Sequence, residues 1–516
     1  MKRIISVIIP VFITLIFYTC SSPLTENDGT ITIDLNKSLF WAADPTEELG
    51  NMDFTITLSG SGSTITEHIN GQSPLSILLS AGAWHITITA TGDRPDKYDS
   101  MIFPSERMLL AMGEADFTVK EEINPVGRAI NPLPVSITMN PATEISNWAQ
   151  LKEAFSKAGA SPEIVIVTGN ISVNELIKNP FDMYDDRNVA IVKAGQNIIL
   201  RAEKNVTIKR ADSSPHEYDF FRIMENGSLT LEGRGGTLTI SGNNKAVSYP
   251  LIQIGNGISG KDGCLVMNEG THITANYSDQ TAAISAAGTF TMNGGTISHN
   301  TNDRAVGGGV SVSGTFNMYG GTIHNNKIID AASIDETFWW SSMYGGGGGV
   351  VVEKFGTFTM YGGTITNNSV CSNKISRGGG VYVYGGTFYM KGNAMICNNK
   401  CDDAGFNIPN AYGGGVYVSD NGKFYMSENA DVFGNLAKGN NSSRGGGVYI
   451  NGSGNTFEKT GNSRIFGLMI GITANIVDPD YMAGGHAVYY TSTRYKNSTA
   501  GPGVNLSLTS SANWDY

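Results

Sequence analysis

The chain has 516 residues and a formal net charge of −11, with 40% hydrophobic and 16% charged residues. This length predicts more than one domain, and the hydrophobic share is too high for a disordered chain. The sequence shows no basic stripe of the kind that binds phosphate backbones, so we expect no nucleic-acid partner. The 64 glycines cluster between short apolar runs, which is typical of turns between strands.

The N-terminus has the pattern of an export signal. Two basic residues precede an apolar run from Ile4 to Phe17, which is too short to span a bilayer core that needs about 20 residues. Cys20 follows this run and resembles the acylated cysteine of a bacterial lipobox. The resemblance implies a signal peptide over 1–20 and a membrane partner reached through a lipid on Cys20. It also implies localisation in the bacterial cell envelope, at the outer membrane or cell surface. Ordinary cleavage that leaves a free cysteine is the alternative.

Residues 21–142 show the alternation of apolar and polar residues that is typical of strands, as in Phe54-Thr-Ile-Thr-Leu58. Short alternating strands with turn signals between them predict a small antiparallel β-sandwich. The stretch from Leu79 to Thr91 is similar to the penultimate strand of immunoglobulin-like modules on bacterial surface proteins, where a small-Gly-small-Trp turn leads into alternating residues. The resemblance implies an Ig-like spacer module.

One helix is predicted within residues 143–162. Ser146 is the expected N-cap, and Trp148, Leu151 and Phe155 share one apolar face. A β-helix must cover its first open edge, because an exposed edge invites another strand to pair there. We therefore expect this helix to cap a β-helix, and a linker helix packed on the sandwich is the alternative.

From about residue 230 a core pattern of 20 to 23 residues recurs. Each copy runs from a glycine triplet through Val-x-Val, Phe-x-Met and Thr-Ile to an asparagine. Period-two alternation places the Val, Phe, Met and Ile side chains on one side, which predicts a coil of three short strands around an apolar centre. Stacking supplies the strand pairing and continuous core that a single coil lacks. The best copies are Gly307 to Asn326, Gly347 to Asn368, Gly378 to Asn399 and Gly413 to Asn435.

An asparagine recurs three residues after the isoleucine or valine of each copy. Asparagine tolerates left-handed backbone, and stacked amides hydrogen-bond along a ladder. We interpret these residues as a structural turn ladder without a catalytic role. They are Asn276, Asn300, Asn326, Asn368, Asn399 and Asn435.

The repeat resembles a known family over roughly residues 230–490. Gly-Gly-Val at the strand start and Ile-x-x-Asn at the turn resemble the Gly-Gly-Ala/Val/Ile and Phe-x-x-Asn tetrapeptides of polymorphic outer-membrane protein repeats, and more generally bacterial right-handed β-helix repeat proteins. The resemblance implies an all-β protein with a right-handed parallel β-helix over 163–490, a cap or tail over 491–516, and a role in adhesion. Isoleucine replaces the family's phenylalanine. We expect no autotransporter barrel after the repeats, and we expect the lipid on Cys20 to replace self-transport.

Repeat length varies at one place, between the asparagine and the next glycine triplet, so the long loops are expected along one edge of the solenoid. The longest loop contains Trp339 and Trp340, which either bind a ligand or partner or fold back onto the coil. The middle residue of Val-x-Val is expected to point outward, which places Tyr382, Tyr417 and Tyr449 in an outward aromatic stripe. Such a stripe suits sugar rings or protein partners. Ordinary β-propensity on an exposed sheet is the alternative.

We looked for the acidic clusters that hold calcium in β-helix polysaccharide lyases and for the paired carboxylates of glycosidases. We interpret the acidic candidates as solvated charges in loops, and the histidines occupy non-equivalent positions of the repeat. We therefore predict no catalytic residue, no metal and no cofactor. The candidates considered are Asp330, Asp335, Glu336, Asp402, Asp403, His272, His299 and His324.

The leading hypothesis is a non-catalytic, adhesin-like surface lipoprotein that binds glycan or protein through the loop edge or the tyrosine stripe. The alternative is a calcium-assisted polysaccharide lyase or a glycosidase on the same scaffold. Cys371 and Cys401 occupy neighbouring coils, where a disulfide and two reduced thiols both fit the sequence.

Overall fold

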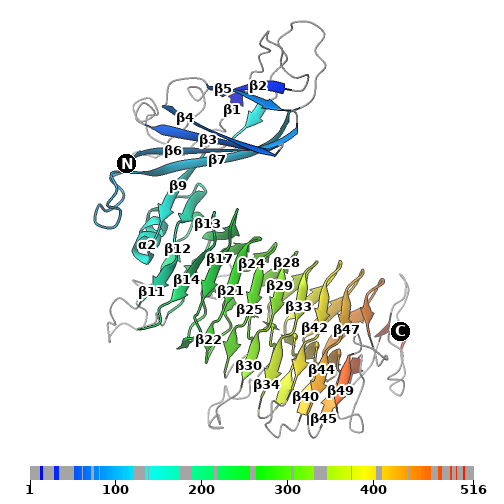
Figure 1. The fold of residues 1–516 in the computed structure, drawn as a ribbon. Helices are drawn as coiled ribbons and strands as arrows, with labels where there is room; N and C mark the ends of the chain where they lie inside the picture. The colour runs from blue at the N-terminus through cyan, green and yellow to red at the C-terminus, as the bar shows by residue number, and fades with distance from the viewer. Residues whose placement is uncertain are drawn as a thin grey trace, which may run out of the picture. The chain divides into compact units, whose positions relative to one another are not determined.

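The computed structural model divides into two compact units, residues 1–145 with 159–166 and residues 146–158 with 167–516 (Figure 1). It describes residues 12–14, 28–33, 52–60, 62–70, 75–80, 82–119, 134–137, 139–174, 189–213, 218–255, 263–303, 307–329, 346–372, 375–402, 410–439, 442–452, 454–466, 475–478, 488–490, 495–496 and 504–505.

The first unit is built of antiparallel strands. Alternation decides which side chains are buried: Phe54, Ile56 and Leu58 of one strand face a core that Ile77 and Leu79 also enter. The main sheet has the order β4 (Ser63–Asn70), β3 (Asp53–Gly60), β6 (Gly82–Asp93), β7 (Arg107–Val119), β9 (Asn140–Ile145) and β10 (Glu163–Val167). Two antiparallel pairs accompany it, β2 (Asp28–Ile33) with β5 (Leu75–Ser80) and β1 (Phe12–Thr14) with β8 (Pro134–Ser136).

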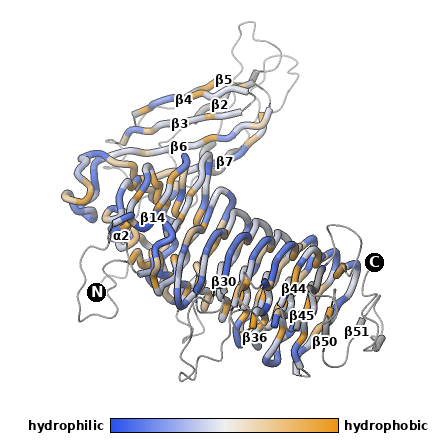
Figure 2. Tube along the Cα trace, turned by 60° about the horizontal axis from the view of Figure 1, so that its bottom comes forward, coloured by the Kyte–Doolittle hydropathy of each residue, from blue (hydrophilic) through white to orange (hydrophobic). Residues whose placement is uncertain are grey.

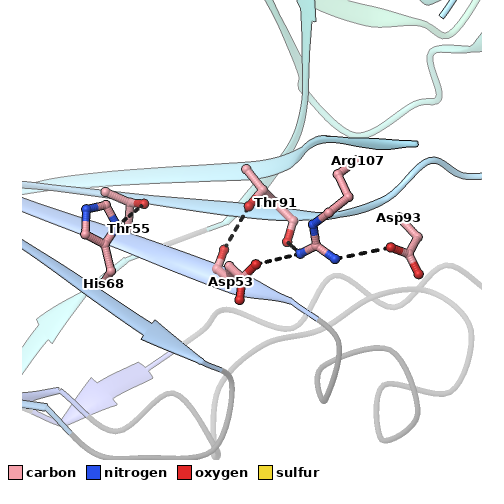
Figure 3. Close-up of polar contacts among 6 residues, drawn as sticks. All are labelled: Asp53, Thr55, His68, Thr91, Asp93 and Arg107. Atoms are coloured by element: carbon pink, nitrogen blue, oxygen red, sulfur yellow. Dashed lines mark hydrogen bonds and ion pairs between the residues drawn. The ribbon is translucent and has the colours of Figure 1, made fainter. Parts of the chain in front are cut away.

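Arg107 ties three strand ends of this unit together (Figure 3). Its guanidinium lies 2.7 Å from the Asp53 carboxylate and 3.2 Å from that of Asp93, and it donates to the Thr91 carbonyl. All three charged side chains are exposed, so solvent screens the ion pairs and each contributes little to stability. The network therefore joins the ends of β3, β6 and β7 and stabilises the sheet only weakly.

The second unit is a parallel β-helix whose coils follow one another in chain order (Figure 1). The chain passes from one parallel sheet to the next and returns to the first one coil later. The Val-x-Val segments form the β12–β50 sheet: β12 (Ala190–Val192), β15 (Phe221–Ile223), β19 (Ile252–Ile254), β23 (Ile284–Ala286), β27 (Val310–Val312), β31 (Val350–Val352), β36 (Val381–Tyr384), β41 (Val416–Ser419), β46 (Val448–Ile450) and β50 (Val488–Tyr490).

The Phe-x-Met and Thr-Ile segments form the next two sheets. The β13–β47 sheet holds β13 (Asn197–Ala202), β16 (Ser228–Gly233), β20 (Cys264–Met267), β24 (Thr289–Met292), β28 (Thr315–Met318), β32 (Thr357–Met360), β37 (Thr387–Met390), β42 (Lys423–Met426) and β47 (Thr456–Lys459). The β11–β48 sheet holds β11 (Ile171–Val173), β14 (Val206–Arg210), β17 (Leu238–Ser241), β21 (Thr271–Thr274), β25 (Thr296–Ser298), β29 (Thr322–His324), β33 (Thr364–Thr366), β38 (Met395–Cys397), β43 (Asp431–Phe433) and β48 (Arg464–Ile465).

The expectation of three strands per coil was incomplete, because the residues after each asparagine form a fourth strand. Ile328, Val370 and Cys401 face inward there and build a small core of their own with two alanines. This β18–β49 sheet holds β18 (Ala246–Val247), β22 (Tyr277–Ser278), β26 (Thr301–Asn302), β30 (Lys327–Ile329), β34 (Ser369–Cys371), β39 (Lys400–Cys401), β44 (Leu436–Lys438) and β49 (Ile476–Asp478). Later coils add a fifth strand in the β35–β45 sheet, with β35 (Ile375–Arg377), β40 (Asn410–Tyr412) and β45 (Ser442–Arg444), and a hairpin of β51 (Tyr495–Lys496) and β52 (Val504–Asn505) follows.

Equivalent residues of successive coils lie directly on one another, as the parallel register requires. Hydrophobic and hydrophilic residues alternate along the coils (Figure 2), and the inward phenylalanines are buried. Their rings stack nearly parallel, with neighbouring centroids 4.5 to 5.3 Å apart. This spacing follows from the strand separation of about 4.8 Å, so the phenylalanines form one continuous column within the core. The column comprises Phe290, Phe316, Phe358, Phe388, Phe424 and Phe457.

Helix α2 (Trp148–Lys157) begins one residue later than expected, because Asn147 is its N-cap in place of Ser146. The Asn147 side chain accepts a hydrogen bond from the Gln150 backbone, and the Gln150 side chain in turn accepts from the Ser146 backbone. Trp148 and Phe155 pack against the rings of Phe220 and Phe221 in the first coils. Within the described residues no helix has the length and apolarity to cross a membrane.

The asparagine ladder is a chain of amide hydrogen bonds that runs from coil to coil. From Asn326 onward, the side-chain oxygen of each ladder residue accepts from both the backbone nitrogen and the amide nitrogen of the asparagine one coil earlier, as Asn399 does from Asn368, both at 2.9 Å. At the start of the ladder, the Asn300 oxygen accepts from the Asn276 backbone nitrogen. Asn435 passes the same pair of bonds to Asn475, one coil beyond the predicted members. All are buried, and the left-handed backbone lies one residue earlier, as at Asn367 (φ 54°).

The glycine triplet allows successive coils to stack closely. The first glycine adopts left-handed backbone, as Gly378 does with φ 59°. The second leaves no room for a side chain, because a Cβ on Gly379 would lie 2.4 Å from the carbonyl oxygen of Gly414 in the next coil. Together they let the chain enter the next Val-x-Val strand in register.

We predict that Asn368→Ala lowers the free energy of unfolding by about 3 kcal/mol. The substitution removes the hydrogen bonds that Asn368 makes to the buried backbone and amide nitrogens of Asn326 and to the Ile323 carbonyl. Chemical denaturation monitored by circular dichroism measures the change. Asn317→Ala, on the outward face of β28, is the matched control and should change it little. Equal losses in the two variants would contradict a ladder role.

Candidate functional site

The tyrosine stripe is stacked in register but is not an exposed surface. Tyr382, Tyr417 and Tyr449 pair directly across β36, β41 and β46. Their exposed fractions are only 5%, 3% and 4%. The expectation that they would face solvent was wrong.

The reason is the fifth strand, which folds back over this face. Tyr412 of β40 stacks on Tyr449 with a centroid distance of 4.8 Å, and the Arg377 guanidinium of β35 lies 5.7 Å from the Tyr417 ring centroid. The Tyr382 hydroxyl is hydrogen-bonded to Ser419 at 3.1 Å. The residues between a ladder asparagine and the next glycine triplet thus cover a second, aromatic core.

This burial also controls ionisation. Desolvation raises the pKa of Tyr382 and of Tyr449 to about 12, and it raises the pKa of Tyr417 further. The three hydroxyl groups therefore stay protonated to higher pH than the hydroxyl of an exposed tyrosine, whose pKa is about 10.

Several predicted sites lie outside the described residues. Cys20 is one, and Trp339 and Trp340 of the longest insertion are others. Asp330, Asp335, Glu336 and Asp403 likewise lie outside, whereas Asp402 is described and pairs with Lys400 at 3.4 Å.

The cysteines and histidines of the coil do not converge on a shared site. Cys371 and Cys401 are not joined by a disulfide, and the register places Cys401 opposite Val370, so the two thiols face opposite sides of the sheet. His299 and His324 do meet, with ring centroids 5.6 Å apart, whereas His272 bonds to Thr296. Among the residues that the structure describes, no group of three or more His, Cys, Asp or Glu is placed to hold a metal ion.

A pocket of about 770 Å³ opens on the outer face of the β12–β50 sheet, in the coils of β15 and β19. Tyr218 and Tyr249 form one aromatic wall, with ring centroids 5.3 Å apart. Arg222 and Gln253 project from neighbouring strands, since they pair directly in the sheet. The remaining lining residues are Lys193, Ala194, Asp219, Met224, Glu225, Pro250 and Gly255.

Asp219 and Arg222 form a salt bridge within this lining. The guanidinium donates to both carboxylate oxygens, at 2.7 and 3.0 Å. The Asp219 side chain is 1% exposed and that of Arg222 is 19% exposed, so the aspartate anchors the arginine from below. Burial raises the pKa of Asp219, and the hydrogen bonds from Arg222 oppose that shift. A bidentate pair of this kind fixes the arginine in one orientation.

Side chains from the interior of the coil hydrogen-bond to the backbone of the two wall tyrosines. Buried Arg210 donates to the Tyr218 carbonyl at 2.7 Å, and its guanidinium lies 4.9 Å from the Phe220 ring centroid. Desolvation lowers the pKa of Arg210 to about 10. Asn276, the first predicted ladder residue, donates to the Tyr249 carbonyl. The two tyrosines are therefore positioned by the same interior that stabilises the coil.

This pocket was not predicted, because its segments lack the motif that marks the best copies of the repeat. Its segments are Tyr218 to Met224 and Tyr249 to Ile254, and neither contains the glycine triplet. One signal was present: each has a tyrosine four residues before a long polar residue, Arg222 or Gln253. Aligning these two segments 31 residues apart would have placed the pairs side by side. Searches against protein-family models, curated proteins and solved structures find no match to this chain.

We predict that Tyr417→Ala lowers the free energy of unfolding by roughly 3 kcal/mol, because it leaves a cavity beneath the β35–β45 sheet. Urea denaturation measures the loss. Tyr319→Ala serves as the control, since Tyr319 is 54% exposed. An unchanged free energy of unfolding in Tyr417→Ala would contradict the burial of this tyrosine and would make the tyrosine stripe a candidate surface again.

Proposed function

We propose that this protein is a non-catalytic, adhesin-like lipoprotein of a bacterial envelope that binds carbohydrate in the pocket of Tyr218 and Arg222. In this proposal Cys20 carries the lipid, residues 21–142 are an Ig-like spacer, and α2 caps a right-handed β-helix. The β-helix is the rigid scaffold that presents the pocket.

The observation that carries the proposal is the combination of side chains in the pocket. Tyrosine rings offer flat apolar faces to the C–H groups of a pyranose, and their hydroxyls offer polar contacts. Arg222 and Gln253 are directional hydrogen-bonding groups held one coil apart. A concave site with an apolar wall and a few fixed polar groups is the usual form of a small-ligand site.

The hydrogen bonds of the buried Asp219 carboxylate favour binding without catalysis. Both Asp219 oxygens accept hydrogen bonds from Arg222, and the side chain is almost wholly buried. A catalytic carboxylate must reach a reacting atom or its proton. Asp219 is instead engaged in orienting Arg222, which suits a recognition role.

The purified protein should bind defined carbohydrates on a glycan array. We predict that the double variant Tyr218→Ala, Tyr249→Ala weakens binding at least about tenfold, because it removes the aromatic wall. Tyr319→Ala with Tyr361→Ala is the matched control, since those rings form an exposed stacked pair just after the ends of β28 and β32. Binding that survives in the pocket variant would contradict the proposed site.

The remaining outcomes separate the alternatives. Loss of binding only in a Trp339→Ala, Trp340→Ala variant would move the site to the longest insertion. Release of saccharide products on incubation, with or without calcium, would identify a lyase or glycosidase and overturn the non-catalytic assignment.

A further inference from the structure

The outer face of the β12–β50 sheet changes character along the coil axis. One column of outward residues can be followed through the parallel register, in the order Arg222, Gln253, Ser285, Ser311, Val351, Tyr382. The first four are polar and partly exposed. Val351 and Tyr382 are buried, since the β35–β45 sheet begins to cover the face there.

The four polar residues form a track that leads away from the pocket. Strands in a sheet lie about 4.8 Å apart, so these side chains span about 14 Å. The two serines are small, so the track stays shallow beyond the larger Arg222 and Gln253. Ser311 also donates to Glu353 in the next coil, which marks the end of the polar stretch. This length exceeds a single sugar ring and suits a short chain of them.

The positive and negative charges of the residues that line the pocket sum to zero. Lys193 and Arg222 are cationic, and Asp219 and Glu225 are anionic. The Arg222 charge is already compensated by Asp219 at 2.7 Å. An acidic sugar would have to compete with that buried carboxylate for the guanidinium, and it would lose its own hydration. A hydroxyl-rich neutral sugar meets no such cost.

We propose that the ligand is a neutral oligosaccharide that lies along the coil axis, with one unit in the Tyr218 pocket and further units over Ser285 and Ser311. This inference rests on the proposed function and adds the ligand's charge class and its direction on the protein. Extension ends where Val351 and Tyr382 become covered.

The test measures affinity by isothermal titration calorimetry for the mono-, di-, tri- and tetrasaccharide of the neutral series that scores best on the array. We expect affinity to rise at least about tenfold from the monosaccharide to the trisaccharide and then to level off. The corresponding series of uronic acid oligosaccharides should bind at least about tenfold more weakly.

Ser285→Tyr is designed to block the track with a side chain that the same column carries farther along, at Tyr382. We expect this variant to bind the trisaccharide no better than the monosaccharide. Thr322→Tyr makes the same kind of change on the outward face of β29 and is the control, with the full gain retained.

The failures are distinguishable. If the monosaccharide binds in a Tyr218-dependent manner and chain length adds nothing, the track is refuted while the pocket stands. Tighter binding of the acidic series would refute the neutral-ligand assignment alone. If no carbohydrate depends on Tyr218 and Tyr249, the proposed function itself fails.

Discussion

The structure of the second unit depends on one constraint: each coil pairs its backbone with the coils before and after it in a fixed parallel register. Every side chain therefore lies on its equivalent, and a residue type is favoured only if it tolerates its own copies about 4.8 Å away. Phenylalanine satisfies this by stacking, as between Phe316 and Phe358 at 4.6 Å. Asparagine satisfies it by bonding to itself, as between Asn368 and Asn399. Gly379 satisfies it by leaving space for the next coil's carbonyl.

The same constraint explains why the candidate site lies where repetition is weakest. Identical residues stacked in register saturate one another's contacts, which leaves few groups for a ligand. In the coils of β15 and β19 the stacked residues differ, with Arg222 beside Gln253 and a salt bridge from Asp219 below. Farther along the same face the column becomes tyrosine, and the β35–β45 sheet covers it. One face thus carries the candidate site at one end and a second core at the other.

The sequence was sufficient for the features that repeat. Period-two alternation and the Ile-x-x-Asn step predicted the stacked coil and the positions of the ladder asparagines. The sequence was insufficient for features that depend on tertiary packing. Alternation correctly placed Tyr417 outside the central core, but no local pattern shows that Ile375–Arg377 and Asn410–Tyr412 return to cover it. The fourth strand escaped notice because segments such as Lys400–Cys401 are too short to show a period. The pocket escaped because its two copies share only a tyrosine and a polar residue.

The most direct test of the account is hydrogen–deuterium exchange with and without the best-binding oligosaccharide. The account predicts slower exchange on binding in the backbone amides of residues 218–225 and 249–255, and in those of β23 and β27. The amides of β36, β41 and β46 should not change, because the fifth strand already covers that part of the face. Ligand-dependent protection confined to β36, β41 and β46 would contradict the central claim that the open end of this sheet is the recognition surface.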